Sequence, residues 1–165
     1  MKTLYLARHT KSSWEMEGVD DFHRPLQAKG IQKAKKAARY LNDLHIKVDK
    51  ITSSPAVRAL ETARLIAAGI GFPKEKILIE PKIYEGSINK IVECIYATED
   101  EFDSLMIFGH NPAITHLANL FLDPGVEFMP TMGIACVSFN TDKWSSIPLT
   151  KPKNEFILFP KSLPD

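Results

Sequence analysis

The chain has 165 residues, of which 44% are hydrophobic and 25% charged, the size and composition of a single globular domain. Its formal net charge of +1 gives no overall basic or acidic signal, so we expect neither nucleic acid nor a membrane as a partner. No apolar run approaches the roughly 18 residues that span a bilayer, and we see no signal peptide. We therefore expect one domain over residues 1–165, located in the cytoplasm.

Short apolar runs alternate along the chain with stretches of helical composition. This alternation is typical of a mostly parallel sheet covered by helices, and the last run indicates an extra strand at the sheet edge. In residues 30–44 the apolar side chains recur at helical spacing, as on a helix with one face on a sheet. In chain order we expect strands in residues 2–7, 48–54, 76–80, 103–110, 133–140 and 155–160, and helices in 30–44, from Ser54 to Gly69 or Gly71, in 87–97 and from Asn111 onward.

Two of the predicted helices begin beside a residue that can bind an anion. Ser54 can accept hydrogen bonds from free amides and Pro55 suits a first helical position, which places Arg58 one turn inside that helix. Asn111 is also followed by a proline, so His110 is predicted to be the last strand residue before a helix N-terminus. Both helix starts are expected to point toward the same edge of the sheet.

The carboxyl ends of the predicted strands carry a distinctive set of side chains. In an open parallel sheet the loops after these ends share one edge, and ligands bind there. Arginine and helix N-termini both favour phosphate oxygens, so this edge is expected to bind a phosphoryl dianion. Histidine can act as a nucleophile and form a covalent intermediate, and His9 is the candidate. The residues at this edge are Arg8, His9, Arg58, Tyr84, Glu85 and His110.

Several motifs together resemble a known family. ARHTKSSW, DDFHRPLQAKG, SSPAVRALETA, IYEGS, FGHNPAITHLA and MPTMGIACVSF are similar to the histidine phosphatase, or phosphoglycerate mutase-like, superfamily, and within it to the short-chain branch of SixA-like phosphohistidine phosphatases. The resemblance covers most of the chain, and the Arg-His pair combined with SSPAVRALETA is its most specific part. It implies a three-layer α/β/α sandwich with a mostly parallel central sheet and a phosphatase that needs no metal or other cofactor.

The resemblance also implies roles for individual residues. His9 is the nucleophile, Arg8 and Arg58 clamp the phosphate, and His110 binds phosphate and stabilises the transition state. Arg24 lies near the pocket mouth, where it can also simply pair with a neighbouring aspartate.

Two further positions are read from the same resemblance. Glu85 falls where larger members place the general acid, although it can equally be an exposed carboxylate at a helix start. Thr10 occupies a position where glycine is usual, and its hydroxyl can approach the phosphate. The resemblance places Glu85 in the catalytic set and Thr10 in the phosphate-binding set.

Other functions stay open at this point. A metal-dependent hydrolase would use His9, His110 and Glu85 as ligands, but two guanidiniums in the same pocket would repel a dication. The two cysteines, far apart and without a CxxC motif, add no metal site. A non-catalytic phosphate- or phosphoprotein-binding module is a further alternative.

The short chain bears on the choice of substrate. It leaves little material for a lid, and an open pocket suits a phosphoryl group on a protein, including phosphohistidine. The alternative substrate is a small phosphoester.

Overall fold

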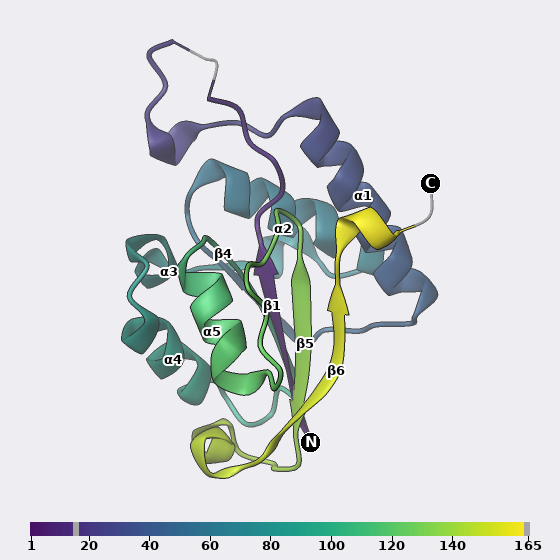
Figure 1. The fold of residues 1–165 in the computed structure, drawn as a ribbon, viewed down its shortest axis with the longest axis vertical. Coiled ribbons are helices and arrows are strands. Elements are labelled where there is room, and N and C mark those ends of the chain that lie inside the picture. The colour runs from purple at the N-terminus through teal and green to yellow at the C-terminus, as the bar shows by residue number, and fades with distance from the viewer. Residues whose placement is uncertain (15–16, 164–165) are drawn as a thin grey trace.

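The computed structural model describes residues 1–14 and 17–163, and within them six strands form one sheet in the order β3-β2-β4-β1-β5-β6 (Figure 1). The strands are β1 (Lys2–Arg8), β2 (Lys50–Ser53), β3 (Leu78–Ile79), β4 (Ser104–Gly109), β5 (Ile134–Phe139) and β6 (Pro152–Leu158). The helices are α1 (Ala28–Asp43), α2 (Val57–Ile70), α3 (Pro81–Glu85), α4 (Ile88–Tyr96) and α5 (Ala113–Phe121), with the 3₁₀ segments η1 (Asp21–His23), η2 (Lys74–Lys76), η3 (Trp144–Leu149) and η4 (Pro160–Ser162). The predicted α/β fold with a mostly parallel sheet is confirmed.

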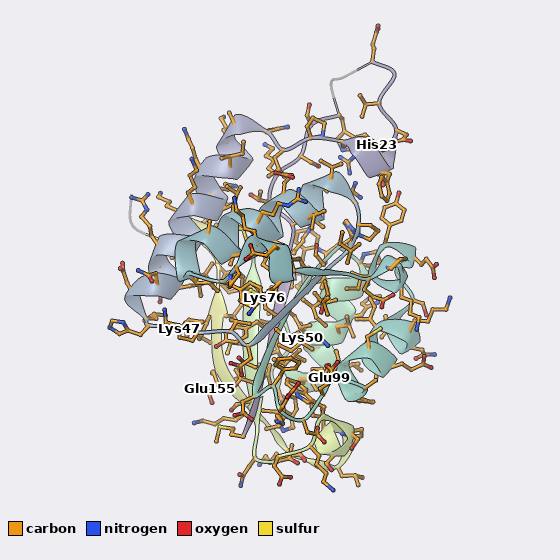
Figure 2. The ribbon with its side chains drawn as sticks, turned by 180° about the vertical axis from the view of Figure 1, so that it is seen from behind. His23, Lys47, Lys50, Lys76, Glu99 and Glu155 are labelled. Atoms are coloured by element: carbon orange, nitrogen blue, oxygen red, sulfur yellow. The ribbon has the colours of Figure 1, made fainter. Side chains whose placement is uncertain are left out.

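Helices cover both faces of the sheet and give the molecule three layers. Side chains alternate along β1: Leu4 and Leu6 enter the core under α4 and α5, and Tyr5 and Ala7 enter the core under α1 and α2. Figure 1 shows the α3–α5 layer in front, and Figure 2 shows α1 and α2 from behind. In the described part of the chain no helix combines the length and the apolar character needed to cross a membrane.

Strand β5 differs from the predicted pattern because it runs antiparallel to β1. After α5, residues 122–133 return to the carboxyl end of β1, where Ile134 pairs with Ala7. The Arg8 amide donates to the Gly133 carbonyl at 3.0 Å. The reversal therefore brings the segment before β5 to the edge where the predicted site residues lie.

The start of α2 also differs from the prediction. The helix begins at Val57 rather than at Pro55, and the residue before it, Ala56, makes no side-chain cap. The Ser54 hydroxyl accepts a hydrogen bond from the Ala56 amide at 3.2 Å, ahead of the helix. Ser54 therefore orders the turn that leads from β2 into α2, and its hydroxyl is also free to contact a neighbouring loop.

At the start of the central strand β1, at the end away from the two histidines, the buried side chain of Lys2 joins three segments. Lys2 is 1% exposed, and its Nζ donates to the carbonyls of Asp100 (2.6 Å) and Phe102 (3.0 Å) and to Asp103 Oδ1 (3.0 Å). The ammonium also lies 5.8 Å from the centroid of the Trp144 ring. One charge thus ties the start of β1 to the α4–β4 loop and to η3.

We predict that Lys2→Met lowers the free energy of unfolding by about 2 kcal/mol, since the buried carbonyls lose their charged donor while the apolar stem is kept. Urea denaturation followed by circular dichroism measures the change. Lys153→Met is the control, because Lys153 is 75% exposed and its pairing with Glu155 is long, 3.6 Å. Equal stability of wild type and Lys2→Met would contradict the assignment.

Candidate active site

Two histidines stand side by side because β1 and β4 are parallel neighbours in register. Arg8 pairs with Gly109 at the ends of the two strands, and His9 and His110 follow directly. The His9 amide continues the ladder by donating to the Gly109 carbonyl at 3.1 Å. The two imidazole rings lie with their centroids 5.2 Å apart. The pairing of two central strands therefore sets the distance between the rings.

The hydrogen bonding of His9 defines its tautomer. Its Nδ1 lies 2.7 Å from the Thr10 carbonyl oxygen, which can only accept, so Nδ1 carries the hydrogen and Nε2 keeps its lone pair. Burial, with the charges of Arg58 and Arg8, lowers the pKa of His9 from 6.5 to about 4, although the bond to Thr10 raises it. At neutral pH the side chain is thus an uncharged imidazole with a free nucleophilic nitrogen.

A hydrogen bond with Ser54 orients the His110 ring, as the bond with Thr10 orients His9. The His110 Nε2 lies 2.7 Å from the Ser54 Oγ, which accepts from the Ala56 amide and can donate its own hydrogen. Burial and the charge of Arg58 lower the pKa of His110 from 6.5 to about 3. We assign Nε2 as the acceptor from Ser54, which puts the hydrogen of the neutral ring on Nδ1. This Nδ1 is buried and without a partner in the described residues.

One carboxylate holds two arginines at the pocket. Arg58 donates from Nη1 to the Asp21 carbonyl (2.6 Å) and from Nη2 to Asp21 Oδ2 (3.0 Å). Arg24 donates from Nε to Asp21 Oδ1 at 3.2 Å. The Tyr84 hydroxyl donates to Oδ2 at 2.9 Å, and its ring meets the His110 ring edge-on. Asp21 is therefore the carboxylate of the site.

The ionisation of Asp21 follows from these contacts. Burial raises the pKa of its carboxyl, but the hydrogen bonds from Tyr84 and Arg58 and the charges of both arginines outweigh it, so the pKa lies below its usual value. Asp21 is ionised at neutral pH and acts as an acceptor. It keeps the two guanidiniums from repelling each other.

Arg8 approaches the pocket from the other side. Its Nη1 donates to the Met129 carbonyl at 3.1 Å, and its guanidinium lies 5.0 Å from the centroid of the Phe128 ring. Both partners belong to the segment that the antiparallel β5 brings to this edge. Arg8 is thus fixed by a carbonyl and an aromatic face, with no carboxylate among its contacts in residues 1–14 and 17–163.

Three buried N–H donors at this edge have no acceptor within the described residues. They are Arg8 Nε, Arg58 Nε and His110 Nδ1. Leaving a buried donor unpaired costs about 1–3 kcal/mol, so the site gains when an oxygen-rich anion enters. Arg8, Arg24 and Arg58 against the single carboxylate of Asp21 also leave the pocket with excess positive charge. This arrangement suits a phosphoryl group.

The structure places the other two predicted site residues elsewhere. The Thr10 hydroxyl donates to the Gly30 carbonyl at 2.8 Å, so it holds its loop to α1, and binding phosphate would require this bond to break. Glu85 is about half exposed and pairs with Lys90 at 3.0 Å. No contact joins Glu85 to His9 in the described part of the chain, and its role as general acid stays a prediction.

Sequence reasoning missed several residues of the site. Asp21 entered only as a possible partner of Arg24, and Ser54 only as a helix cap. Trp14 was not among the predicted site residues, yet the Arg24 guanidinium carbon lies 3.4 Å from the centroid of its ring, and the residue is 74% exposed. The spacing of Asp21 and Arg24, three apart within one 3₁₀ turn, is the signal that could have identified the carboxylate.

The ligand set of the alternative metal-dependent hydrolase does not come together in the structure. Glu85 turns to Lys90, while His9 and His110 bind Thr10 and Ser54. Within residues 1–14 and 17–163, no group of three or more His, Cys, Asp or Glu side chains is placed to hold a metal ion.

Comparison with known proteins identifies the class. Residues 4–101 match the histidine phosphatase superfamily (branch 1), and the chain belongs to this family. An uncharacterized protein of Mycobacterium tuberculosis (strain H37Rv), Rv1276c, is 31% identical over 138 residues, which cover 78% of this chain and 84% of the relative. Membership of the superfamily supports phosphatase activity.

Solved structures agree on the fold. The protein histidine phosphatase SixA complexed with tungstate superposes with a TM-score of 0.81 at 18% identity, covering 96% of this chain and 97% of that one. A mycobacterial glucosyl-3-phosphoglycerate phosphatase superposes with a TM-score of 0.68 at 15% identity, covering 94% and 97%. The likeness to the SixA fold, expected from the motifs, is confirmed.

We predict that Ser54→Ala lowers kcat about tenfold or more, because His110 loses the donor that fixes its tautomer. Nitrogen NMR of the His110 ring reports the tautomer, and hydrolysis of phosphoramidate reports kcat. The matched control is Ser53→Ala, since the Ser53 hydroxyl donates to a backbone carbonyl, that of Ser54, at 2.9 Å. An unchanged tautomer together with an unchanged kcat would refute the assigned role.

We also predict that both imidazoles bind protons only in acid. As their pKa values are lowered to about 4 and about 3, each ring stays neutral until the pH falls well below the ~6.5 of a free imidazole. NMR titration of the ring carbons measures the midpoints. Arg58→Gln is expected to raise both, because it removes a nearby positive charge.

The control for this titration is Arg64→Gln, on the same helix, where the guanidinium pairs with Glu61 at the surface. It should leave both midpoints in place. Midpoints of both rings near 6.5 in the wild type would contradict the description of the site.

Proposed function

We propose that this protein hydrolyses phosphohistidine on a phosphoprotein through a covalent phosphohistidine intermediate on His9. The observation that carries the proposal is the tautomer of His9: Nδ1 is held by a carbonyl, which leaves Nε2 unprotonated beside three unpartnered donors. A nucleophile and an oxyanion site therefore adjoin each other. Covalent catalysis of this kind splits one difficult displacement into two easier steps.

In the first step the Nε2 lone pair of His9 attacks phosphorus, and the bond from phosphorus to the substrate nitrogen breaks. The leaving imidazole takes the electron pair and gains a proton from solvent. In the second step water attacks the phosphorus, the bond to Nε2 breaks, and inorganic phosphate leaves as a water proton passes to solvent. His9 is restored unchanged.

The unpartnered donors supply the stabilisation that both steps need. Arg8, Arg58 and His110 face the equatorial phosphoryl oxygens, where charge is spread in the transition state. Arg24 is joined to Arg58 through Asp21 and adds positive charge to the site. The tungstate complex of SixA supports this view, because tungstate is a tetrahedral oxyanion like phosphate.

Neither Asp21 nor Glu85 is placed to donate a proton to a leaving group, and this favours a nitrogen leaving group over an alkoxide. Asp21 is held ionised by two arginines and a tyrosine, so it is a poor proton donor, and Glu85 pairs with Lys90. An alkoxide leaves phosphorus slowly without an acid, whereas imidazole leaves more readily. A pocket with this set of groups suits phosphohistidine better than an alkyl phosphoester.

We predict that radiolabel from phosphoramidate becomes bound to His9 during turnover. Quenching in alkali, in which phosphohistidine survives, followed by peptide mapping locates the label. His9→Ala should abolish the adduct and lower kcat by at least about a thousandfold. His116→Ala is the matched control, because His116 lies exposed on α5.

Steady-state kinetics with two phosphopeptides decides which phosphoryl group is preferred. Peptides that differ only in carrying phosphohistidine or phosphoserine are compared by kcat/KM, and the first is expected to be preferred. Full activity of His9→Ala would exclude the intermediate. An equal or higher kcat/KM for phosphoserine would exclude phosphohistidine as the preferred group while leaving the intermediate intact.

A further inference from the structure

A cleft lies beside Arg8 of the candidate active site. It is a cleft of about 360 Å³ between α1, the segment before β5 and η4, which lie next to one another in Figure 1. We call it the Phe159 cleft. Its volume is near the lower limit of ligand pockets, roughly 300–1,000 Å³, which suits one or two side chains. Its lining consists of Lys33, Phe128, Pro130, Thr131, Phe159, Pro160 and Lys161.

The Phe159 cleft shares a wall with the phosphate pocket. The Phe128 ring lines the cleft and also covers the guanidinium of Arg8, at 5.0 Å from its centroid. The next residue, Met129, accepts a hydrogen bond from Arg8. A polypeptide with its phosphorylated side chain on Arg8 therefore has its flanking residues beside the cleft.

The walls of the cleft are apolar and open to solvent. Phe128 is 57% exposed and Phe159 is 38% exposed, and Pro130 and Pro160 also line the cleft. Exposed aromatic rings around a hollow are typical of contact surfaces, because a partner that covers them removes apolar area from water. The cleft is thus suited to receive a large apolar side chain.

The charged residues in the lining of the cleft all have one sign. Lys33 and Lys161 belong to its lining, which includes no carboxylate. Neither lysine takes part in an ion pair within residues 1–14 and 17–163. Two cations in the lining of an apolar hollow complement a segment that carries acidic residues around an apolar one.

We propose that the Phe159 cleft binds an acidic segment of the same phosphoprotein whose phosphoryl group enters the phosphate pocket, with one large apolar side chain seated between the two phenylalanines. The inference rests on the proposed function and adds how the protein part of the substrate is recognised. The cleft selects among phosphoproteins, and the chemistry stays with His9.

The test uses two synthetic peptides that each carry one phosphohistidine and one leucine, flanked by glutamates in one and by lysines in the other. The wild type should show a kcat/KM about tenfold higher for the glutamate peptide, and the preference should shrink as salt is added. Lys33→Glu combined with Lys161→Glu should abolish or reverse the preference. Phe159→Ser should lower kcat/KM for the glutamate peptide relative to phosphoramidate.

Lys47→Glu is the matched control, because Lys47, labelled in Figure 2, lies on the α1–β2 connection and is not part of the lining of the cleft. It should keep the wild-type preference. Equal kcat/KM for the two peptides in the wild type would overturn the cleft proposal while leaving the proposed function standing.

A measurement without turnover separates the two proposals. Fluorescence anisotropy gives the affinity for the unphosphorylated glutamate peptide, which the double lysine variant should bind about tenfold more weakly than the wild type. Unaltered affinity would overturn the cleft proposal. If the wild type bound this peptide through the lysines but hydrolysed no phosphohistidine, the proposed function would fail and the cleft would stand as a binding site.

Discussion

The hydrogen bond from the His9 amide to the Gly109 carbonyl, 3.1 Å, extends the pairing of β1 and β4 just past their ends. On the other side the His9 carbonyl accepts from the Met132 amide at 3.1 Å. His9 is thus fixed by backbone from two directions before any side chain contributes. Because Gly109 belongs to β4 and Met132 is fully buried, His9 is held by the sheet and the buried segment beside it.

The electrostatics of the pocket follow from this rigid placement. Burial keeps both histidines neutral, so the positive charge that attracts an anion comes from the arginines and does not compete for the lone pair of His9. Asp21 neutralises part of that charge and spaces Arg24 from Arg58. A carboxylate that looks like a catalytic acid is therefore better explained as the group that lets two guanidiniums share one small site.

Arg8, His9, Arg58 and His110 could be located from the sequence because each follows an apolar run, and parallel strands bring such ends together. Asp21 could not, since η1 has no buried residue and leaves no periodic pattern. The sequence also could not tell which of the neighbours Tyr84 and Glu85 faces the site. Successive side chains on a helix point about 100° apart. Tyr84 therefore reaches Asp21, while Glu85 meets Lys90. The direction of β5 was missed because an alternating order of elements gives the number of strands but not the route of each connection.

The antiparallel direction of β5, which the sequence did not predict, has the widest consequence for the site. A parallel β5 would begin at the far edge of the sheet, and residues 127–133 would lie away from the histidines. In the antiparallel arrangement the same segment fixes Arg8 through the Met129 carbonyl and builds one wall of the Phe159 cleft through Phe128. Strand direction therefore couples the position of Arg8 to the shape of the Phe159 cleft. A change in this segment is expected to disturb both, because the same few residues hold the guanidinium and line the cleft.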